Sequence, residues 1–235
     1  MKFGAIVLAR MDSSRLPGKA MKKIGEKTLI EHCISRLKSI SACQPILATS
    51  DRGIDRPLIE MAKKNGIDYF AGDIENVANR VRKCIDHFKL DYFARINGDS
   101  PFLNTQLLQN AFNELTDRKY DFVTNLLPRS FPYGISVEIF DTGVYKAAYD
   151  LFSGNKKYEE HITSYFYDNR ANYRFKNIES GFGIPDDELL KIRLVIDTED
   201  DYETIRKMYE LDSTVFEADI QSVCTLYKKV NNKQK

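Results

Sequence analysis

The chain has 235 residues, 43% of them hydrophobic and 29% charged, which is the size and composition of one globular α/β domain. Its net charge of +1 argues against a protein that binds nucleic acid or a membrane surface, because such proteins usually carry a clear basic excess. No apolar run approaches the ~20 residues of a membrane-spanning helix, and the run at 3–9 is too short for a secretory signal.

Four cysteines are present, and none of them forms the C-x-x-C pair that is typical of a zinc site. Cys33 and Cys84 fall on the apolar stripes of predicted helices, so we expect buried thiols. Free thiols are typical of a reducing compartment, and we therefore expect a cytoplasmic protein.

Apolar runs alternate with amphipathic segments through the first 120 residues, as in β-α-β units on a mostly parallel sheet. Thr28 and Glu31 have the spacing of a capping box, Gly66 is placed to end a helix, and Asn104 is placed to begin one. We predict strands over 4–9, 46–49, 68–71 and 92–96, and helices over 28–40, 57–65, 77–88 and 105–117.

The regular alternation of apolar runs and amphipathic segments ends at about residue 120. We predict strands over 122–124, 135–140, 173–178 and 193–196, and helices over 142–152, 158–168, 199–211 and 218–230. The whole chain, 1–235, is interpreted as a single α/β domain with a mostly parallel, Rossmann-like twisted sheet flanked by helices. Residues 120–190 are predicted to be a mixed α+β insertion that covers the carboxyl edge of the sheet.

Three cations follow the first predicted strand within ten residues: Arg10, Arg15 and Lys19. Open α/β sheets bind ligands at the carboxyl ends of their strands, where this loop is expected. The small residues between the cations let backbone N–H groups form a phosphate nest, and guanidinium and ammonium groups suit a triphosphate. The residues alone leave open a solvated basic loop that closes a turn. The chain has neither a Walker A loop nor the G-x-G-x-x-G turn of nicotinamide sites.

The segment Ala9-Arg10-Met11-Asp12-Ser13-Ser14-Arg15-Leu16-Pro17-Gly18-Lys19 resembles the signature of the cytidylyltransferases that activate sialic acids and 3-deoxy-manno-octulosonate. In spacing it is similar to the octulosonate enzymes and to the spore-coat polysaccharide branch, and the resemblance continues at 48–51, 72–77, 98–101 and 195–200. It implies an enzyme of surface polysaccharide biosynthesis whose partners are CTP and a sugar or sugar-acid acceptor. It also makes a homodimer plausible, with 120–190 as the acceptor and possible dimerisation region.

Asp99 ends the fourth predicted strand, at the same sheet edge as the basic loop. A carboxylate beside a triphosphate is favourable only with a cation between them, and Mg²⁺ is usually held by one or two carboxylates together with phosphates. The resemblance implies that Asp99 and Asp197 are metal ligands for this Mg²⁺ cofactor. The alternatives are that Asp99 caps a helix or a turn, and that Asp197 or Thr198 only caps the helix that follows.

The resemblance also implies the remaining site residues. Arg10, Arg15 and Lys19 would be catalytic, with Arg15 and Lys19 on the β- and γ-phosphates. Asn76 and Arg80 could equally be a solvated helix face, Ser50 a turn cap and His161 a structural histidine. Ser136 stands where the similar enzymes have an aspartate, which leaves the acceptor open. The predicted nucleotide-binding residues are Leu8, Ala9, Arg10, Ser14, Ser50, Asn76, Arg80 and Gly98, and the predicted acceptor-binding residues are Glu138, Glu160 and His161.

Two other functions are open at this point. A glycosyltransferase that consumes a nucleotide sugar would usually show Asp-x-Asp at the metal strand, where this chain has Asn97-Gly98-Asp99. A catalytically silent nucleotide-binding subunit would be expected to have lost some of the charged residues, yet both aspartates and all three cations are present.

Overall fold

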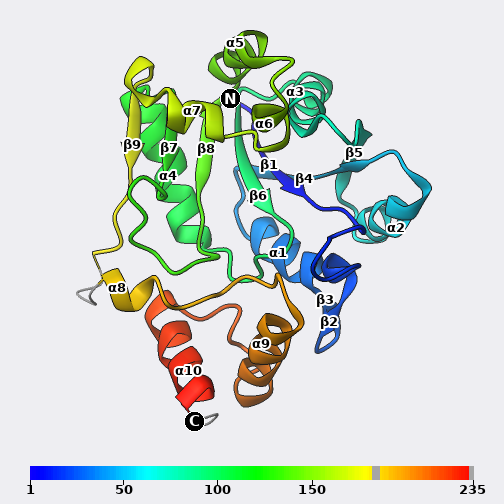
Figure 1. Cartoon of the computed structure of the whole chain (residues 1–235), viewed down its shortest axis with the longest axis vertical. Helices are drawn as coiled ribbons and strands as arrows, with labels where there is room; N and C mark the ends of the chain where they lie inside the picture. The colour runs from blue at the N-terminus through cyan, green and yellow to red at the C-terminus, as the bar shows by residue number, and fades with distance from the viewer. Residues whose placement is uncertain (182–185, 233–235) are drawn as a thin grey trace.

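The structure is a computed structural model that describes residues 1–181 and 186–232. Its centre is a seven-stranded sheet in the order β5-β4-β1-β6-β8-β7-β9 (Figure 1). Strands β5, β4, β1 and β6 are parallel, β8 is antiparallel to both β6 and β7, and β9 pairs parallel with β7. The predicted α/β class with a mostly parallel sheet is therefore confirmed. The strands are β1 Phe3–Leu8, β4 Cys43–Ser50, β5 Asp68–Gly72, β6 Tyr92–Asn97, β7 Phe122–Thr124, β8 Glu138–Asp141 and β9 Phe175–Asn177.

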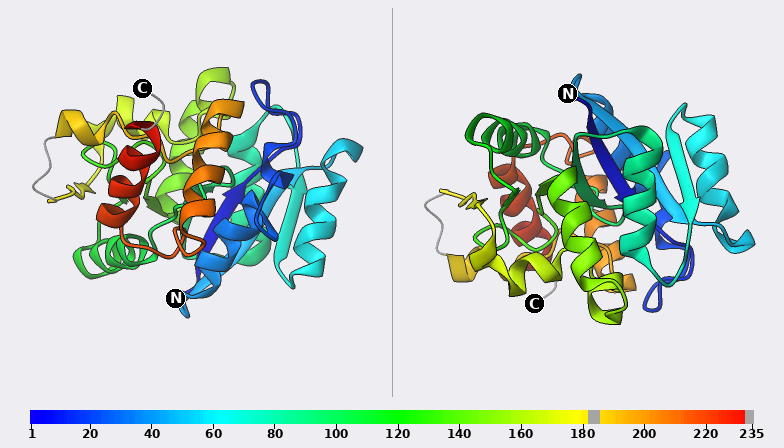
Figure 2. Two further views of the ribbon diagram at one scale, coloured as in Figure 1. Left: turned by 90° about the horizontal axis from the view of Figure 1, so that it is seen from below. Right: turned by 90° about the horizontal axis from the view of Figure 1, so that it is seen from above.

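Helices cover both faces of this sheet (Figure 2). Side chains alternate along each strand, so that Ala5 and Val7 of β1 pack into one apolar cluster and Ile6 into the other. The first cluster includes residues of α1 Leu29–Lys38, α2 Arg56–Lys64, α4 Thr105–Arg118, α9 Glu199–Leu211 and α10 Ile220–Asn232. The second includes residues of α3 Val77–Phe88, α5 Thr142–Phe152 and α7 Ser164–Asp168.

Local sequence signals set several helix ends as predicted. Thr28 and Glu31 form both hydrogen bonds of a capping box at the start of α1. The Asn104 side chain accepts a hydrogen bond from the Leu107 N–H at the start of α4. Gly66 follows the C-cap residue Asn65 of α2 and has a φ of 62°, a conformation that a glycine adopts at little cost.

Three predictions after residue 120 are wrong in part. The helix predicted over 158–168 is two helices, α6 Lys156–Glu160 and α7, because the backbone leaves the helical region at His161 before two β-branched residues of low helix propensity. The strand predicted over 135–140 is regular only from Glu138, since the Asn125 side chain bonds the Ile135 carbonyl and the Val137 N–H.

The strand predicted over 193–196 does not belong to the sheet. It runs as an extended segment beside Tyr133, with one isolated bridge between Tyr133 and Arg193. Gly134 makes this approach possible, because a Cβ atom there would come within 2.5 Å of the Leu194 carbonyl. No prediction covered the β2–β3 hairpin, Lys23–Ile24 and Lys27–Thr28, or the short helix α8, Asp186–Leu189.

Residues 120–190 extend the sheet and also reach its carboxyl edge. They supply β7, β8 and β9 beyond β6, and they place α6 near the carboxyl ends of β1 and β6. Within the described residues, the four cysteines are free and buried, as expected for Cys33 and Cys84, and burial raises the pKa of each of these two thiols to about 12. No helix built from the described residues has the length and apolar character to span a membrane.

Candidate functional site

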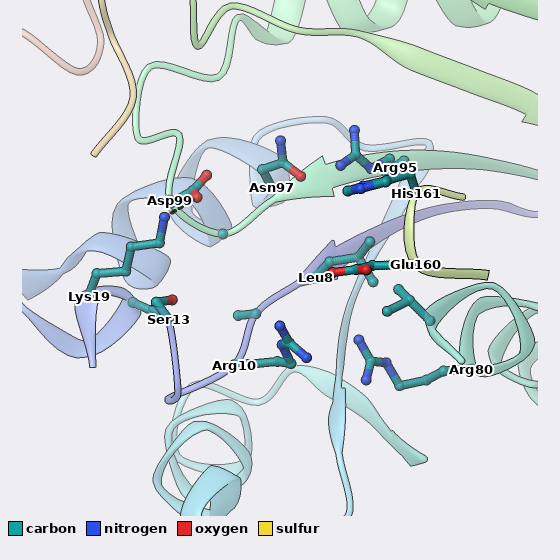
Figure 3. A pocket seen from close by; sticks show the side chains of 14 residues that line it. Leu8, Arg10, Ser13, Lys19, Arg80, Arg95, Asn97, Asp99, Glu160 and His161 are labelled. Carbon is teal, nitrogen blue, oxygen red and sulfur yellow. Dashed lines mark hydrogen bonds and ion pairs between the residues drawn. The ribbon is translucent and has the colours of Figure 1, made fainter. Parts of the chain in front are cut away.

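A pocket of about 250 Å³ opens at the carboxyl ends of β1 and β6 (Figure 3). Its walls come from the loop after β1, the start of α3, the end of β6 and the end of α6. Many of the predicted site residues line it, and they meet there from distant parts of the chain. These residues are Leu8, Ala9, Arg10, Lys19, Arg80, Gly98, Asp99, Glu160 and His161.

The basic loop is closed by its own backbone and anchored to a buried carboxylate. The Gly18 N–H donates to the Met11 carbonyl at 2.7 Å, and the Met11 N–H donates to Asp55 Oδ1 at 2.7 Å. Asp55 is fully buried and also accepts from Ser50 Oγ and Arg52. The anchor Asp55 lies in the short 3-10 helix Gly53–Asp55 between β4 and α2, so no local pattern around residues 9–19 could have revealed it.

Lys19 is the centre of the charged cluster at one end of the pocket. Its Nζ lies 2.6 Å from Asp99 Oδ2 and 2.8 Å from Asp197 Oδ1, and Arg15 Nη2 lies 3.0 Å from Asp197 Oδ2. Burial alone would lower the pKa of Lys19, but the two carboxylates outweigh it and raise that pKa. The basic loop and the two predicted metal ligands are thus in direct contact, although Asp197 is far away in the sequence.

Asp197 reaches this cluster without a sheet strand. The Ile196 N–H donates to the Asp99 carbonyl at 3.1 Å, which fixes the extended segment against the end of β6. Thr198 caps α9, because its side chain accepts from the Asp201 N–H while Asp201 accepts from the Thr198 N–H. The Asp197 carboxylate therefore takes no part in the cap, and it faces Lys19 and Arg15.

The two carboxylates match the donor chemistry of a Mg²⁺ site that is completed by a ligand. Asp99 and Asp197 direct one oxygen each at a single cationic point, now held by the Lys19 ammonium. Among residues 1–181 and 186–232, no three His, Cys, Asp or Glu side chains form a metal-binding group. Mg²⁺ commonly takes only one or two carboxylates and fills its other positions with phosphate oxygens and water. The flexible stem of lysine would let its ammonium move from this point to a phosphate.

Two further features shape the middle of the pocket. Arg80 is 1% exposed, donates from Nη1 to the Asp73 carbonyl at 2.9 Å, and has a buried Nε without a partner. Burial, with some help from nearby Arg10, lowers the pKa of Arg80 to about 10. Gly98 passes so close to β1 that a Cβ atom would lie 3.2 Å from the Leu8 carbonyl oxygen.

Other predicted residues lie outside the lining of this pocket. Ser14 is exposed, and its neighbour Ser13 lines the pocket instead. Ser50 is buried against Asp55, and Asn76 caps α3 beside a neighbouring groove. Glu138 is 1% exposed.

Sequence reasoning missed two lining residues on β6, Arg95 and Asn97. A signal for Arg95 was present, because it is the one charged residue of β6.

Comparison with known proteins identifies a family for this chain. Residues 4–223 match the family described as Cytidylyltransferase. The spore coat polysaccharide biosynthesis protein SpsF of Bacillus subtilis is 31% identical over 212 residues, which cover 87% of this chain and 85% of that protein. A 3-deoxy-manno-octulosonate cytidylyltransferase of Idiomarina loihiensis is 26% identical over 160 residues, which cover 64% and 58%.

Two solved structures are similar in fold. A cytidylyltransferase from Leptospira borgpetersenii superposes with a TM-score of 0.88 at 27% identity, covering 99% of this chain and 96% of that one. The CMP:2-keto-3-deoxy-manno-octonic acid synthetase complexed with CTP has a TM-score of 0.67 at 17% identity, covering 90% and 100%. At that identity the second likeness shows a shared fold.

Proposed function

Because the chain belongs to the cytidylyltransferase family, we propose that it transfers CMP from CTP to a sugar or sugar acid and releases pyrophosphate, with Mg²⁺ as cofactor. One observation carries this proposal. Lys19 of the basic loop lies between the Asp99 and Asp197 carboxylates, at the end of a pocket that also holds Arg10. Such a cluster can bind a triphosphate together with the divalent cation that neutralises it.

In the proposed reaction an acceptor hydroxyl oxygen forms a bond to the α-phosphorus of CTP. The bond from that phosphorus to the oxygen bridging the β-phosphate breaks, pyrophosphate leaves, and the hydroxyl proton passes to solvent. Transfer of this kind depends mainly on positioning and on neutralising charge. Arg15 and Lys19 would hold the departing β- and γ-phosphates, and Arg10 the α- and β-phosphates. Asp99 and Asp197 would hold Mg²⁺, which would screen the charge of the α-phosphate.

The rival functions predict different behaviour. A silent nucleotide-binding subunit would bind CTP without turnover, and a glycosyltransferase would consume a nucleotide sugar and release no pyrophosphate. The first would not need a lysine poised between two carboxylates, and the second would usually show a second aspartate at the position of Asn97.

The test is pyrophosphate release from CTP, UTP, ATP and GTP with Mg²⁺ and a panel of sugars and sugar acids, next to thermal unfolding with each nucleotide. A ligand at 100 times its dissociation constant stabilises the folded state by ~2.7 kcal/mol, so CTP with Mg²⁺ should raise the unfolding temperature clearly. We expect turnover and stabilisation with CTP and much weaker effects with ATP and GTP. An equal response to ATP would overturn the cytidylyl assignment, and no response to any nucleotide would overturn the whole proposal.

A further inference from the structure

A chain of charged side chains that begins at Asp55 holds the basic loop, residues 9–19, from behind. Asp55 is fully buried, and both of its oxygens accept hydrogen bonds. Oδ1 accepts from the Met11 N–H at 2.7 Å, and Oδ2 accepts from the Ser50 hydroxyl and from Arg52 Nη2, the latter at 3.2 Å. A buried carboxylate is tolerated only when donors surround it, so these bonds together fix Met11 to the end of β4.

Arg52 connects this anchor to a second carboxylate, which belongs to the loop itself. Its Nη2 lies 2.8 Å from Asp12 Oδ2, and its Nε donates to Ser50 Oγ at 3.1 Å. Asp12 Oδ1 in turn lies 3.6 Å from Arg10 Nε. Alternating charges therefore run from the buried Asp55 to Arg10, which lines the pocket.

The pair with Asp12 leaves the outer part of the Arg10 side chain to a ligand. It uses Nε, and among the described residues the two terminal nitrogens have no hydrogen-bond or ion-pair partner. Figure 3 shows Arg10 next to Arg80, with its guanidinium inside the pocket. Burial alone would raise the pKa of Asp12, but Arg52 and Arg10 outweigh it and lower that pKa, so Asp12 is charged at neutral pH. Arg10 is thus held on one side and open on the other.

A loop that is already ordered binds its ligand more tightly than a loop that the ligand must order. Fixing torsions costs conformational entropy, and a fold that fixes them beforehand removes this cost from binding. Here the Gly18 N–H closes the loop onto the Met11 carbonyl at 2.7 Å. Resting on the proposed function, we infer that Arg52 and Asp55 are positioning residues for the triphosphate of CTP, which hold the basic loop and Arg10 in their binding conformation before the nucleotide arrives. Neither residue lines the pocket, so both act through the loop.

Asp12 allows a test in which position and charge predict opposite signs. Asp12→Asn keeps the shape of the side chain and removes a negative charge from beside the proposed phosphate site. If charge alone mattered, repulsion of the triphosphate would fall and CTP would bind more tightly. If Asp12 holds Arg10 in place, CTP should bind more weakly. Arg52→Lys is the second test, because it keeps the positive charge and loses the planar guanidinium that reaches both Asp12 and Asp55.

The experiment measures the dissociation constant of CTP by isothermal titration calorimetry, with Mg²⁺ and without an acceptor, so that no turnover interferes. The variants are Asp12→Asn, Arg52→Lys, these two combined, and Asp55→Asn. The matched control is Glu60→Gln, which removes a negative charge from an exposed ion pair with Arg56 on α2. Urea titration measures the stability of each variant separately, and hydrogen exchange measures the order of the loop.

We expect Asp12→Asn and Arg52→Lys each to raise the CTP dissociation constant by about three- to fivefold, as for a partly exposed ion pair. The double variant should lose little more than the worse single one, because the two residues act through each other. Asp55→Asn should lose about tenfold, since it weakens buried hydrogen bonds to a charged group. The Gly18 amide should exchange slowly in wild type, and faster in every loop variant until CTP is added. Glu60→Gln should match wild type in both measurements.

Several results would overturn the inference. One is tighter binding of CTP by Asp12→Asn, which would show that Asp12 acts only by repulsion, and another is an unchanged affinity in Arg52→Lys. A third is a loss of stability in urea with no change in CTP affinity, as expected for a purely structural anchor. If Asp55→Asn does not fold, the variants of Asp12 and Arg52, whose side chains are each 34% exposed, decide alone. Failure of wild type to bind CTP would instead overturn the proposed function.

Discussion

Two charged clusters border the same pocket, and they are built in opposite ways. At one end a cation, Lys19, lies between the carboxylates of Asp99 and Asp197, whose side chains are 21% and 9% exposed. At the other a carboxylate, Glu138, lies between the cation Arg95 and the phenol of Tyr167, with 1% of its side chain exposed. The first cluster borders the pocket and has a flexible ammonium, so Lys19 can leave the two carboxylates and bind a ligand instead. The second is fixed before any ligand arrives.

Under the proposed function, this difference would give the two ends of the pocket different tasks. Charge that develops on a departing pyrophosphate must be met by cations at the phosphate end of the pocket, which is where Lys19 and Arg15 lie. Choosing one acceptor requires a donor held at a fixed angle, which suits the arginine end. Substitutions at the Lys19 end should therefore change turnover more than stability, and substitutions behind Arg95 should do the reverse.

The largest effect is expected at the two aspartates. Asp99→Asn and Asp197→Asn keep the shape of the side chain and remove its charge, so each should lower kcat by about 100- to 1,000-fold while the fold survives. The double variant should cost little more than the worse single one, because residues that act as a unit are not additive. Asp200→Asn, in the exposed first turn of α9, is the matched control. Steady-state turnover and circular dichroism measure this, and a mild Asp197→Asn would remove Asp197 from the site.

Lys19→Ala should lower kcat by about 100-fold, comparable to the loss of one donor that stabilises charge in the transition state. Arg15→Lys should also be poor, because an ammonium cannot reproduce the planar grip of a guanidinium. The control is Lys22→Ala, since Lys22 pairs with Glu199 at 2.8 Å outside the pocket lining. Near-normal turnover of Lys19→Ala would exclude the basic loop from the reaction.

At the other cluster the effect should appear in stability. Glu138→Ala leaves the Arg95 charge without its partner, and breaking a buried ion pair in this way costs about 3 kcal/mol. The free energy of unfolding from urea titration measures the loss. Glu160→Ala, at an exposed position, should stay within about 0.5 kcal/mol of wild type. Equal stabilities of the two variants would contradict a preorganised arginine end.

The smallest effect separates capping from catalysis at the start of α9. Thr198→Ala removes the side-chain oxygen that accepts from the Asp201 N–H and should cost about 1 kcal/mol of stability with little loss of turnover. Asp197→Asn should show the opposite pattern, with a large loss of turnover and a loss of stability limited to its ion pairs with Lys19 and Arg15. Urea titration together with the turnover assay distinguishes them, and near-normal turnover of Asp197→Asn would show that Asp197 takes no part in the reaction.

Signals confined to a few neighbouring residues predicted the structure well. The capping box at Thr28, the cap at Asn104 and the alternation of apolar strands with helices each depend on contacts within a few positions, and each is confirmed. The basic loop was found in the same way. Local signals could not show that Ser13 lines the pocket in place of the predicted Ser14. The turn from Met11 to Gly18 depends on the anchor to Asp55, which is distant in the sequence.

Long-range contacts account for what the sequence could not show. Asp197 was expected to follow a sheet strand, and it reaches Lys19 on an extended segment that hydrogen-bonds to Asp99. Glu138 was expected at the acceptor, and it lies behind Arg95 because β8 pairs antiparallel with β6. The pairing of β6 with β8 joins residues about 45 positions apart, and no local pattern encodes such a pairing.

The central claim is that a cytidylyl group moves from CTP to an acceptor in this pocket. The direct measurement uses CTP labelled with ³²P at the α-phosphate, the sugar-acid panel and Mg²⁺, with products separated by charge. We predict that the label appears in a sugar conjugate of CMP, that pyrophosphate is released unlabelled, and that Asp99→Asn forms neither. Label that stays in CTP with every acceptor, or a phosphorylated sugar formed only from γ-labelled CTP, would contradict the account.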